Sequence, residues 1–66
     1  MNLKTLRESM RLTQDAVAER LGITRTTVSM WESGDTMPRA DKLPQLAKLY
    51  DCTIDDLFQT NDDQTA

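Results

Sequence analysis

Histidine is absent from the 66-residue chain, and cysteine occurs once, at Cys52. The lack of histidine removes the commonest general base and the commonest metal ligand. One cysteine cannot form a disulfide within the chain, so a domain this small must be stabilised by packing alone. We therefore expect no metal, no cofactor and a reducing compartment, the cytoplasm. Cys52 itself is expected to be a small buried apolar residue.

Long apolar runs are also absent. No segment approaches the ~20 apolar residues that span a bilayer, and no apolar stretch of a secretory signal follows the N-terminus. Glycine and proline occur only twice each, and Gly22, Gly34 and Pro38 fall between stretches of helical periodicity. The sequence therefore predicts one small all-α domain of short helices joined by tight turns.

Positive charge is scarce and unevenly distributed. The chain has eight Lys and Arg against eleven Asp and Glu, a net charge of −3. All eight cations lie in residues 1–50 with six acids, whereas residues 51–66 hold five acids and no cation. The overall acidity argues against a nucleic-acid partner, but binding responds to the local field of a patch. The uneven distribution of charge therefore weakens the argument against a nucleic-acid partner.

The spacing of apolar residues predicts five helices. They cover residues 2–10, 14–21, 25–33 and 40–50, and a short segment that starts after Thr53. Threonine is a good N-cap, and Thr13, Thr24 and Thr53 precede three of these helices. Gly22 and Gly34 are expected to end the second and third helices. We expect one domain over residues 1–59 and a polar, disordered tail over residues 60–66.

Two of these helices meet across a tight turn in the stretch 13–34. Ala18 is small enough to let the helices cross closely, and Val17, Leu21, Val28 and Trp31 form a shared apolar seam. This pattern is typical of a helix-turn-helix, which places its second helix in the major groove of DNA. The alternative is a plain helical hairpin within an all-α domain.

The outward face of the segment 25–33 favours DNA binding over a plain hairpin. A solvated face with no partner would carry Glu and Lys, but this segment has no acid before Glu32. Its outward side chains can enter a groove without repelling phosphate. They are Arg25, Thr26, Thr27, Ser29 and Met30.

Several short motifs, taken in order and spacing, resemble the Cro/C1-type (XRE) family of helix-turn-helix repressors. The resemblance covers about residues 3–58. It rests on Leu6-Arg7, Thr13-Gln14, Ala18 with Leu21-Gly22, the segment 28–34 (VSMWESG), Pro38, the segment 46–50 (LAKLY) and the segment 53–58 (TIDDLF). It implies a compact five-helix domain with the helix-turn-helix at helices two and three, and sequence-specific DNA binding in transcriptional control.

The resemblance also implies roles for individual residues. Arg25 and Thr26 match the main base-reading positions, with Ser29 and Met30 further along the groove. Arg25 suits a guanine, because its planar fork spans O6 and N7. Met30 stands where the family often has a polar residue, and either contacts a thymine methyl or fills space. The positions implied to contact phosphate are Thr13, Gln14, Thr24, Ser33 and Arg39.

Two further features follow from the resemblance. Arg7 and Glu32 match a pair that often links the first helix to the end of the third. The last helix often forms a two-fold interface, which here assigns Ile54, Leu57 and Phe58 to a homodimer contact.

The loop at 35–38 departs from the family pattern. It lacks the cation that often meets phosphate in this family, and Asp35 would oppose phosphate there.

The sequence thus favours a DNA-binding regulator, which we expect to be a homodimeric repressor reading an operator of two half-sites. No membrane partner or small-molecule ligand is expected. The alternative is a protein-interaction module of the same fold, an antitoxin or assembly domain with weak DNA affinity. Retention on heparin with and without residues 59–66 would distinguish them. An enzyme is not expected, since no residues suited to acid–base or nucleophilic catalysis are grouped.

Overall fold

The computed structural model describes residues 1–59, which fold into helices alone, with no strand in that range. In chain order the elements are α1 (Leu3–Ser9), α2 (Gln14–Leu21), α3 (Arg25–Ser33), the 3₁₀ turn η1 (Ala40–Lys42), α4 (Leu43–Leu49) and α5 (Ile54–Phe58). The predicted all-α, five-helix fold is confirmed. The predicted tail at 60–66 lies outside the described residues. Within the described part of the chain, no helix has the length and apolarity to cross a membrane.

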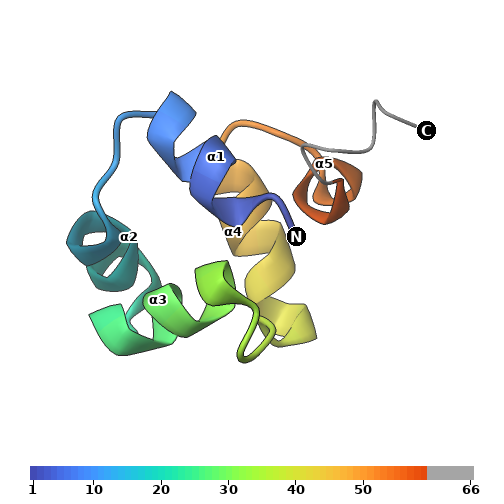
Figure 1. Cartoon of the computed structure of the whole chain (residues 1–66). Helices are drawn as coiled ribbons and strands as arrows, with labels where there is room; N and C mark the ends of the chain where they lie inside the picture. The colour runs from blue at the N-terminus through green and yellow to red at the C-terminus, as the bar shows by residue number, and fades with distance from the viewer. Residues whose placement is uncertain (60–66) are drawn as a thin grey trace.

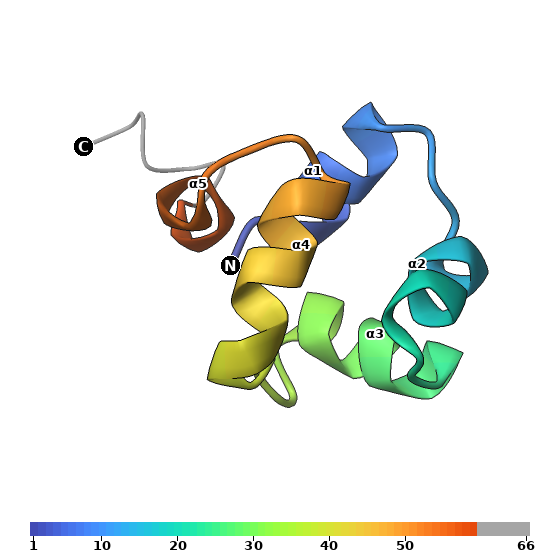
Figure 2. The same ribbon diagram turned by 180° about the vertical axis from the view of Figure 1, so that it is seen from behind.

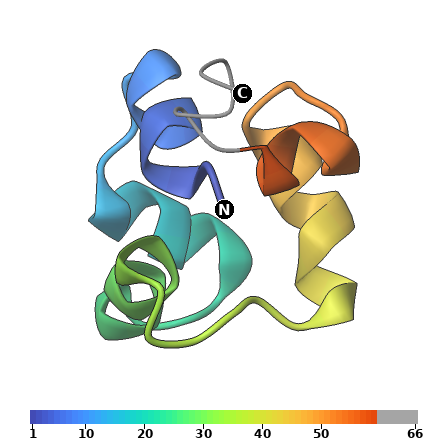
Figure 3. The ribbon, with the colours of Figure 1, turned by 45° about the vertical axis from the view of Figure 1, so that its right-hand side comes forward.

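The α2–α3 hairpin occupies one end of the molecule, and α1 crosses in front of α4 (Figure 1). From behind, α4 runs through the middle, with α5 on the side away from α2 (Figure 2). The extended connection from α3 to η1 runs along the lower edge (Figure 3). The backbone N–H of Asn2 donates to the carbonyl of Leu57 at 2.9 Å. This bond fastens the start of the chain to α5.

Side-chain capping determines where three helices start. The hydroxyl oxygens of Thr13, Thr24 and Thr53 each accept a bond from the backbone N–H three residues later. The carboxylate of Asp56 also accepts from the backbone N–H of Thr53, which completes a capping box. The three predicted N-caps are therefore confirmed.

Four helices end in the same way. A residue with a positive φ lies just past each helix: Gly22 and Gly34 directly follow α2 and α3, whereas Arg11 and Asp51 come two positions after the last residues of α1 and α4. In each case the next backbone N–H donates to the carbonyl five residues before it, the pattern of a Schellman cap. The two glycine ends were predicted. The ends of α1 and α4 use residues for which a left-handed backbone costs energy.

The predicted fourth helix, 40–50, is wrong at its start. Residues 40–42 form the 3₁₀ turn η1, and α4 begins at Leu43 with Pro44 in its first turn. The ring of Pro44 would clash with the carbonyl of Ala40 in a continuous α-helix, and proline has no N–H to donate. The tighter 3₁₀ turn avoids both problems.

One apolar core connects all five helices. Trp31 is only 7% exposed and belongs to this core, as predicted. Cys52 packs at its edge and is half-buried rather than fully buried. Burial raises the pKa of the Cys52 thiol, and Asp56 and Asp51 raise it further, so the thiol is not activated for redox chemistry. The buried residues of this core are Leu3, Val17, Ala18, Leu21, Val28, Trp31, Leu46, Ala47, Tyr50 and Leu57.

Helix α5 divides its apolar residues between the core and the surface. Leu57 is 0% exposed, whereas Ile54 is 40% and Phe58 47% exposed. The prediction that Leu57 belongs to a dimer interface is therefore wrong, because its side chain is enclosed within its own chain. Only Ile54 and Phe58 remain available to a partner.

Candidate nucleic-acid interface

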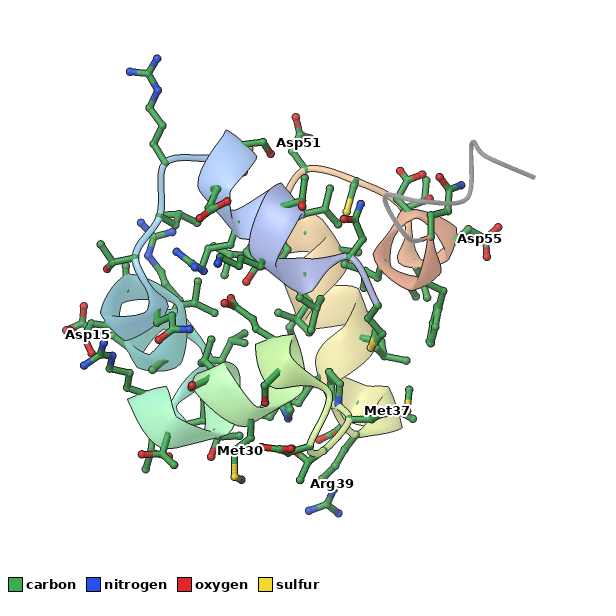
Figure 4. All side chains as sticks on the ribbon, in the orientation of Figure 1. Asp15, Met30, Met37, Arg39, Asp51 and Asp55 are labelled. Carbon is green, nitrogen blue, oxygen red and sulfur yellow. The ribbon has the colours of Figure 1, made fainter. Side chains whose placement is uncertain are left out.

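Three adjoining hollows surround the start of α2, where it lies beside α3 and α1. Gln14, the first residue of α2, lines all three. The first hollow, about 210 Å³, is bounded by Gln14 and by Arg25, Thr26, Ser29 and Met30 of α3. All four residues predicted to read bases thus line one surface. Met30 points away from the body of the molecule along the lower edge of Figure 4.

A hydrogen-bonded network beneath this surface joins α1, α2 and α3. Arg7 Nε donates to Glu32 Oε2 at 2.6 Å and Arg7 Nη2 to Glu32 Oε1 at 3.1 Å. Gln14 Nε2 donates to Glu32 Oε1 at 3.0 Å, and Arg7 Nη1 to the carbonyl of Leu12 at 2.8 Å. The predicted Arg7–Glu32 ion pair is present. Its bidentate geometry is the strong form of such a pair.

The network is shielded from solvent. The Arg7 and Glu32 side chains are 12% and 5% exposed. The hydrogen bond to Glu32 raises the pKa of the Arg7 guanidinium above its ordinary value, against the opposing effect of burial. Gln14 is thereby held against α3, and the second N–H of its amide remains free to donate.

The residues predicted to contact phosphate differ in whether their polar groups are still available to a ligand. Thr13 and Thr24 accept backbone bonds as caps, and the Thr13 hydroxyl hydrogen stays available to a phosphate oxygen. Arg39 points from the lower edge in the same direction as Met30 (Figure 4). Ser33 is less available: its hydroxyl lies 3.1 Å from both the carbonyl of Met30 and the carboxylate of Asp35.

Two residues of this surface were missed by sequence reasoning. Lys4 of α1 lines the hollow that holds Ser29 and Ser33, and its ammonium suits a phosphate. It precedes Arg7 by three residues and so shares its helix face, a signal the sequence did contain. Asp15 lies beside Arg25, with Asp15 Oδ1 3.7 Å from Arg25 Nε.

Asp15 and Glu32 line two of the hollows, whereas two acids of residues 51–66 lie far from them. Asp51 and Asp55 lie at the end of the molecule opposite Met30 and Arg39 (Figure 4). Asp51 and Asp55 are therefore placed away from the hollow of the expected base readers. In the described part of the chain, no group of three or more His, Cys, Asp or Glu residues could hold a metal ion.

Tyr50 packs close to this network and provides a pH-dependent test of the core. Burial, and then the charge of Glu32, raise the pKa of Tyr50 to about 12, from about 10 for a phenol in an unfolded chain. The folded state therefore binds the phenolic proton more tightly. The resulting stability is fully present below pH ~10 and is lost as the pH rises towards ~12.

We expect the free energy of unfolding to fall by up to about 2–3 kcal/mol over this range because of Tyr50 alone. Tyr50→Phe should show a smaller fall in urea unfolding measured between pH ~9 and ~11.5. The chain has one tyrosine, so phenolate absorbance reports on it directly. A phenolate that titrates near pH ~10 in the folded protein would contradict the prediction.

Comparison with known proteins identifies the family. A family model described as helix-turn-helix matches residues 3–57. The HTH-type transcriptional activator BcrR of Enterococcus faecalis is 42% identical over 56 residues, 85% of this chain and 28% of BcrR. Repressor protein C2 of Salmonella phage P22 is 30% identical over 64 residues, 89% of this chain and 30% of C2.

The uncharacterized HTH-type transcriptional regulator YobD of Bacillus subtilis (strain 168) is 36% identical over 61 residues, 92% of this chain and 54% of YobD. The chain thus spans about half or less of the length of these relatives. No solved structure gives a significant match. The chain belongs to the Cro/C1-type (XRE) helix-turn-helix family of transcriptional regulators, which are not enzymes. The resemblance read from the sequence is confirmed.

Proposed function

We propose that the chain binds double-stranded DNA sequence-specifically as a homodimer, with α3 in the major groove, and represses transcription in the cytoplasm. The observation that carries this proposal is the hollow shared by Gln14, Arg25, Thr26, Ser29 and Met30. Its α3 residues combine a guanidinium, two hydroxyls and a thioether with no acid among them. These groups match the donors, acceptors and methyl groups that base edges present.

The surroundings of the hollow suit a phosphate backbone. Lys4, Thr13 and Gln14 line the adjoining hollows, and Arg39 extends beside Met30. Contacts of this kind orient a protein on the duplex, while base contacts select the sequence. One domain of this size reads a half-site, so two copies on an operator of two half-sites account for useful affinity.

Repression requires only that the bound dimer occupy a promoter, whereas activation requires a further contact with the transcription machinery. The relatives carry both names, activator for BcrR and repressor for C2. We therefore assign the simpler activity, and a transcription assay on the selected operator tests it. Increased transcription upon addition of the protein would overturn that assignment but not the DNA binding.

Selection of bound duplexes from a random DNA pool tests the DNA binding itself. A symmetric pair of half-sites about one helical turn apart is expected, because a two-fold dimer presents two copies of α3 to one face of DNA. Failure to enrich any sequence would reject the proposal. A single, unpaired half-site would reject the dimer alone.

A second function, a protein-interaction module, is favoured by a different observation. A hollow of about 410 Å³ between α2 and α4 is lined by Arg20, Leu21, Gln45, Lys48 and Leu49. It combines apolar and basic side chains and does not include any residue assigned to DNA. If the random-pool selection enriches nothing, this alternative becomes the better account.

Arg25→Ala provides the residue-level test of base reading. We expect it to weaken operator binding by about 1–3 kcal/mol and to relax the preference at one base pair in each half-site. Binding to random duplexes should change less. Fluorescence anisotropy with the operator, its single-base variants and a random duplex measures all three. An equal loss on every duplex would mean that Arg25 contacts phosphate instead.

A further inference from the structure

Asp15 and Arg25 meet at the boundary between two of the three hollows. Asp15 is the second residue of α2 and Arg25 the first of α3. Both line the hollow with Arg7, Thr13 and Gln14, while Arg25 alone also lines the hollow of the expected base readers. Figure 4 shows Asp15 at this edge of the molecule, directed into solvent. The carboxylate thus lies in the hollow that also holds Thr13 and Gln14, two residues expected to contact phosphate.

The contact uses a particular part of the guanidinium. Asp15 Oδ1 lies 3.7 Å from Arg25 Nε, beyond hydrogen-bond distance, so the N–H donors of the guanidinium make no hydrogen bond to this carboxylate. A guanine is read by two parallel N–H donors of that kind. Asp15 therefore constrains the side chain without occupying the donors that would read the base.

The pair is weak in the free protein, because the Arg25 and Asp15 side chains are 67% and 76% exposed. Water and salt screen such a pair strongly. A bound duplex would exclude water from this boundary, and the same charges would then interact more strongly. The carboxylate would also repel any phosphate that competed for Arg25.

We propose that Asp15 is a positioning residue that directs Arg25 to a base edge and away from phosphate. This inference rests on the proposed DNA binding. Asp15 raises selectivity at the base pair read by Arg25 and lowers affinity for DNA of any sequence. A purely structural role is also available to Asp15, since a carboxylate in the first turn of α2 favours the helix dipole. That role predicts that replacing Asp15 changes the stability of the fold but does not change the preference at any single base pair.

Asp15→Asn removes the charge and keeps the shape, and asparagine is tolerated near a helix start. Glu19→Gln is the matched control, since Glu19 is an exposed carboxylate one turn further along α2 with no side-chain ion pair among the described residues. Binding is measured for the selected operator, for the variant at the base pair that Arg25→Ala relaxes, and for a random duplex. Thermal unfolding is followed in parallel.

For Asp15→Asn, we expect the operator-to-variant affinity ratio to fall roughly two- to fivefold, the size of an exposed ion pair. Affinity for the random duplex should rise. Glu19→Gln should leave the ratio unchanged, and Asp15→Asn should no longer alter it in an Arg25→Ala background. An equal shift on all duplexes, or the same fall in Glu19→Gln, would overturn the inference while leaving the DNA binding intact. Absence of any selective duplex would reject both.

Discussion

Arg7→Ala is expected to destabilise the fold by about 2–4 kcal/mol, a large share of the stability of a domain this small. The substitution leaves the Glu32 carboxylate, only 5% exposed, with the amide of Gln14 as its single hydrogen-bond partner. It also removes the bond from Arg7 to the carbonyl of Leu12, which holds the connection between α1 and α2. A stranded buried charge costs more than the pair itself contributed.

Glu32→Ala should be destabilising for the reciprocal reason, and the double variant should lose less than the two single losses combined. Urea unfolding of the four proteins gives the coupling energy as a double-mutant cycle. Arg20→Ala is the matched control. Arg20 is an exposed arginine of α2 without an ion pair in the described part of the chain, so its loss should cost less than about 0.5 kcal/mol. Additive losses at Arg7 and Glu32 would show that the pair does not contribute as a unit.

The same network explains why stability and DNA binding should be linked. Glu32 lies near the end of α3 and Gln14 at the start of α2, and both line the hollow that holds Lys4 and Ser29. The network therefore holds three helices beneath the expected reading surface. Variants that loosen it should lose operator affinity even at temperatures where they remain folded.

The helix starts could be predicted because capping depends on local sequence. Thr13, Thr24 and Thr53 each stand directly before the first helical residue, and their hydroxyls reach a backbone N–H three positions away. The two glycine helix ends were predictable for the same reason. The ends at Arg11 and Asp51 were not, because a positive φ is uncommon for any residue other than glycine.

Contacts between distant segments were harder to predict. Periodicity placed Ile54, Leu57 and Phe58 together on the apolar side of the last helix, but could not say which of them the core would enclose. The structure buries Leu57 and leaves the other two exposed. Similarly, the Asp15–Arg25 contact depends on the angle between α2 and α3, which the spacing of residues does not fix.

Ile54→Asp is expected to give a folded monomer that binds a two-half-site operator roughly 100-fold or more weakly than the original chain. Ile54 and Phe58 are 40% and 47% exposed on the same short helix. A two-fold axis brings such a patch against itself, so one substitution removes two sets of contacts. Losing the partner also removes the second copy of α3 from the DNA, which explains the size of the expected effect.

Salt should act in opposite directions on the two association steps. Asp55 and Asp56 belong to α5 and Asp51 lies just before it, so a two-fold contact gathers like charges around the axis. Moderate salt should screen this repulsion and strengthen the dimer. The same salt should weaken DNA binding by competing for phosphate. Sedimentation without DNA and anisotropy with DNA, measured over one salt series, test the opposition.

Two control variants separate an interface from a core position. Met10 is 40% exposed, like Ile54, but lies just after α1, so Met10→Asp should remain a dimer. Leu57→Ala removes a fully buried side chain and should lower the free energy of unfolding by about 2–5 kcal/mol. Circular dichroism and sedimentation distinguish the outcomes for Ile54→Asp. A helical variant that still sediments as a dimer would refute the interface. Loss of helicity would instead show that Ile54 is a core residue, because the buried part of its side chain would then be needed for folding.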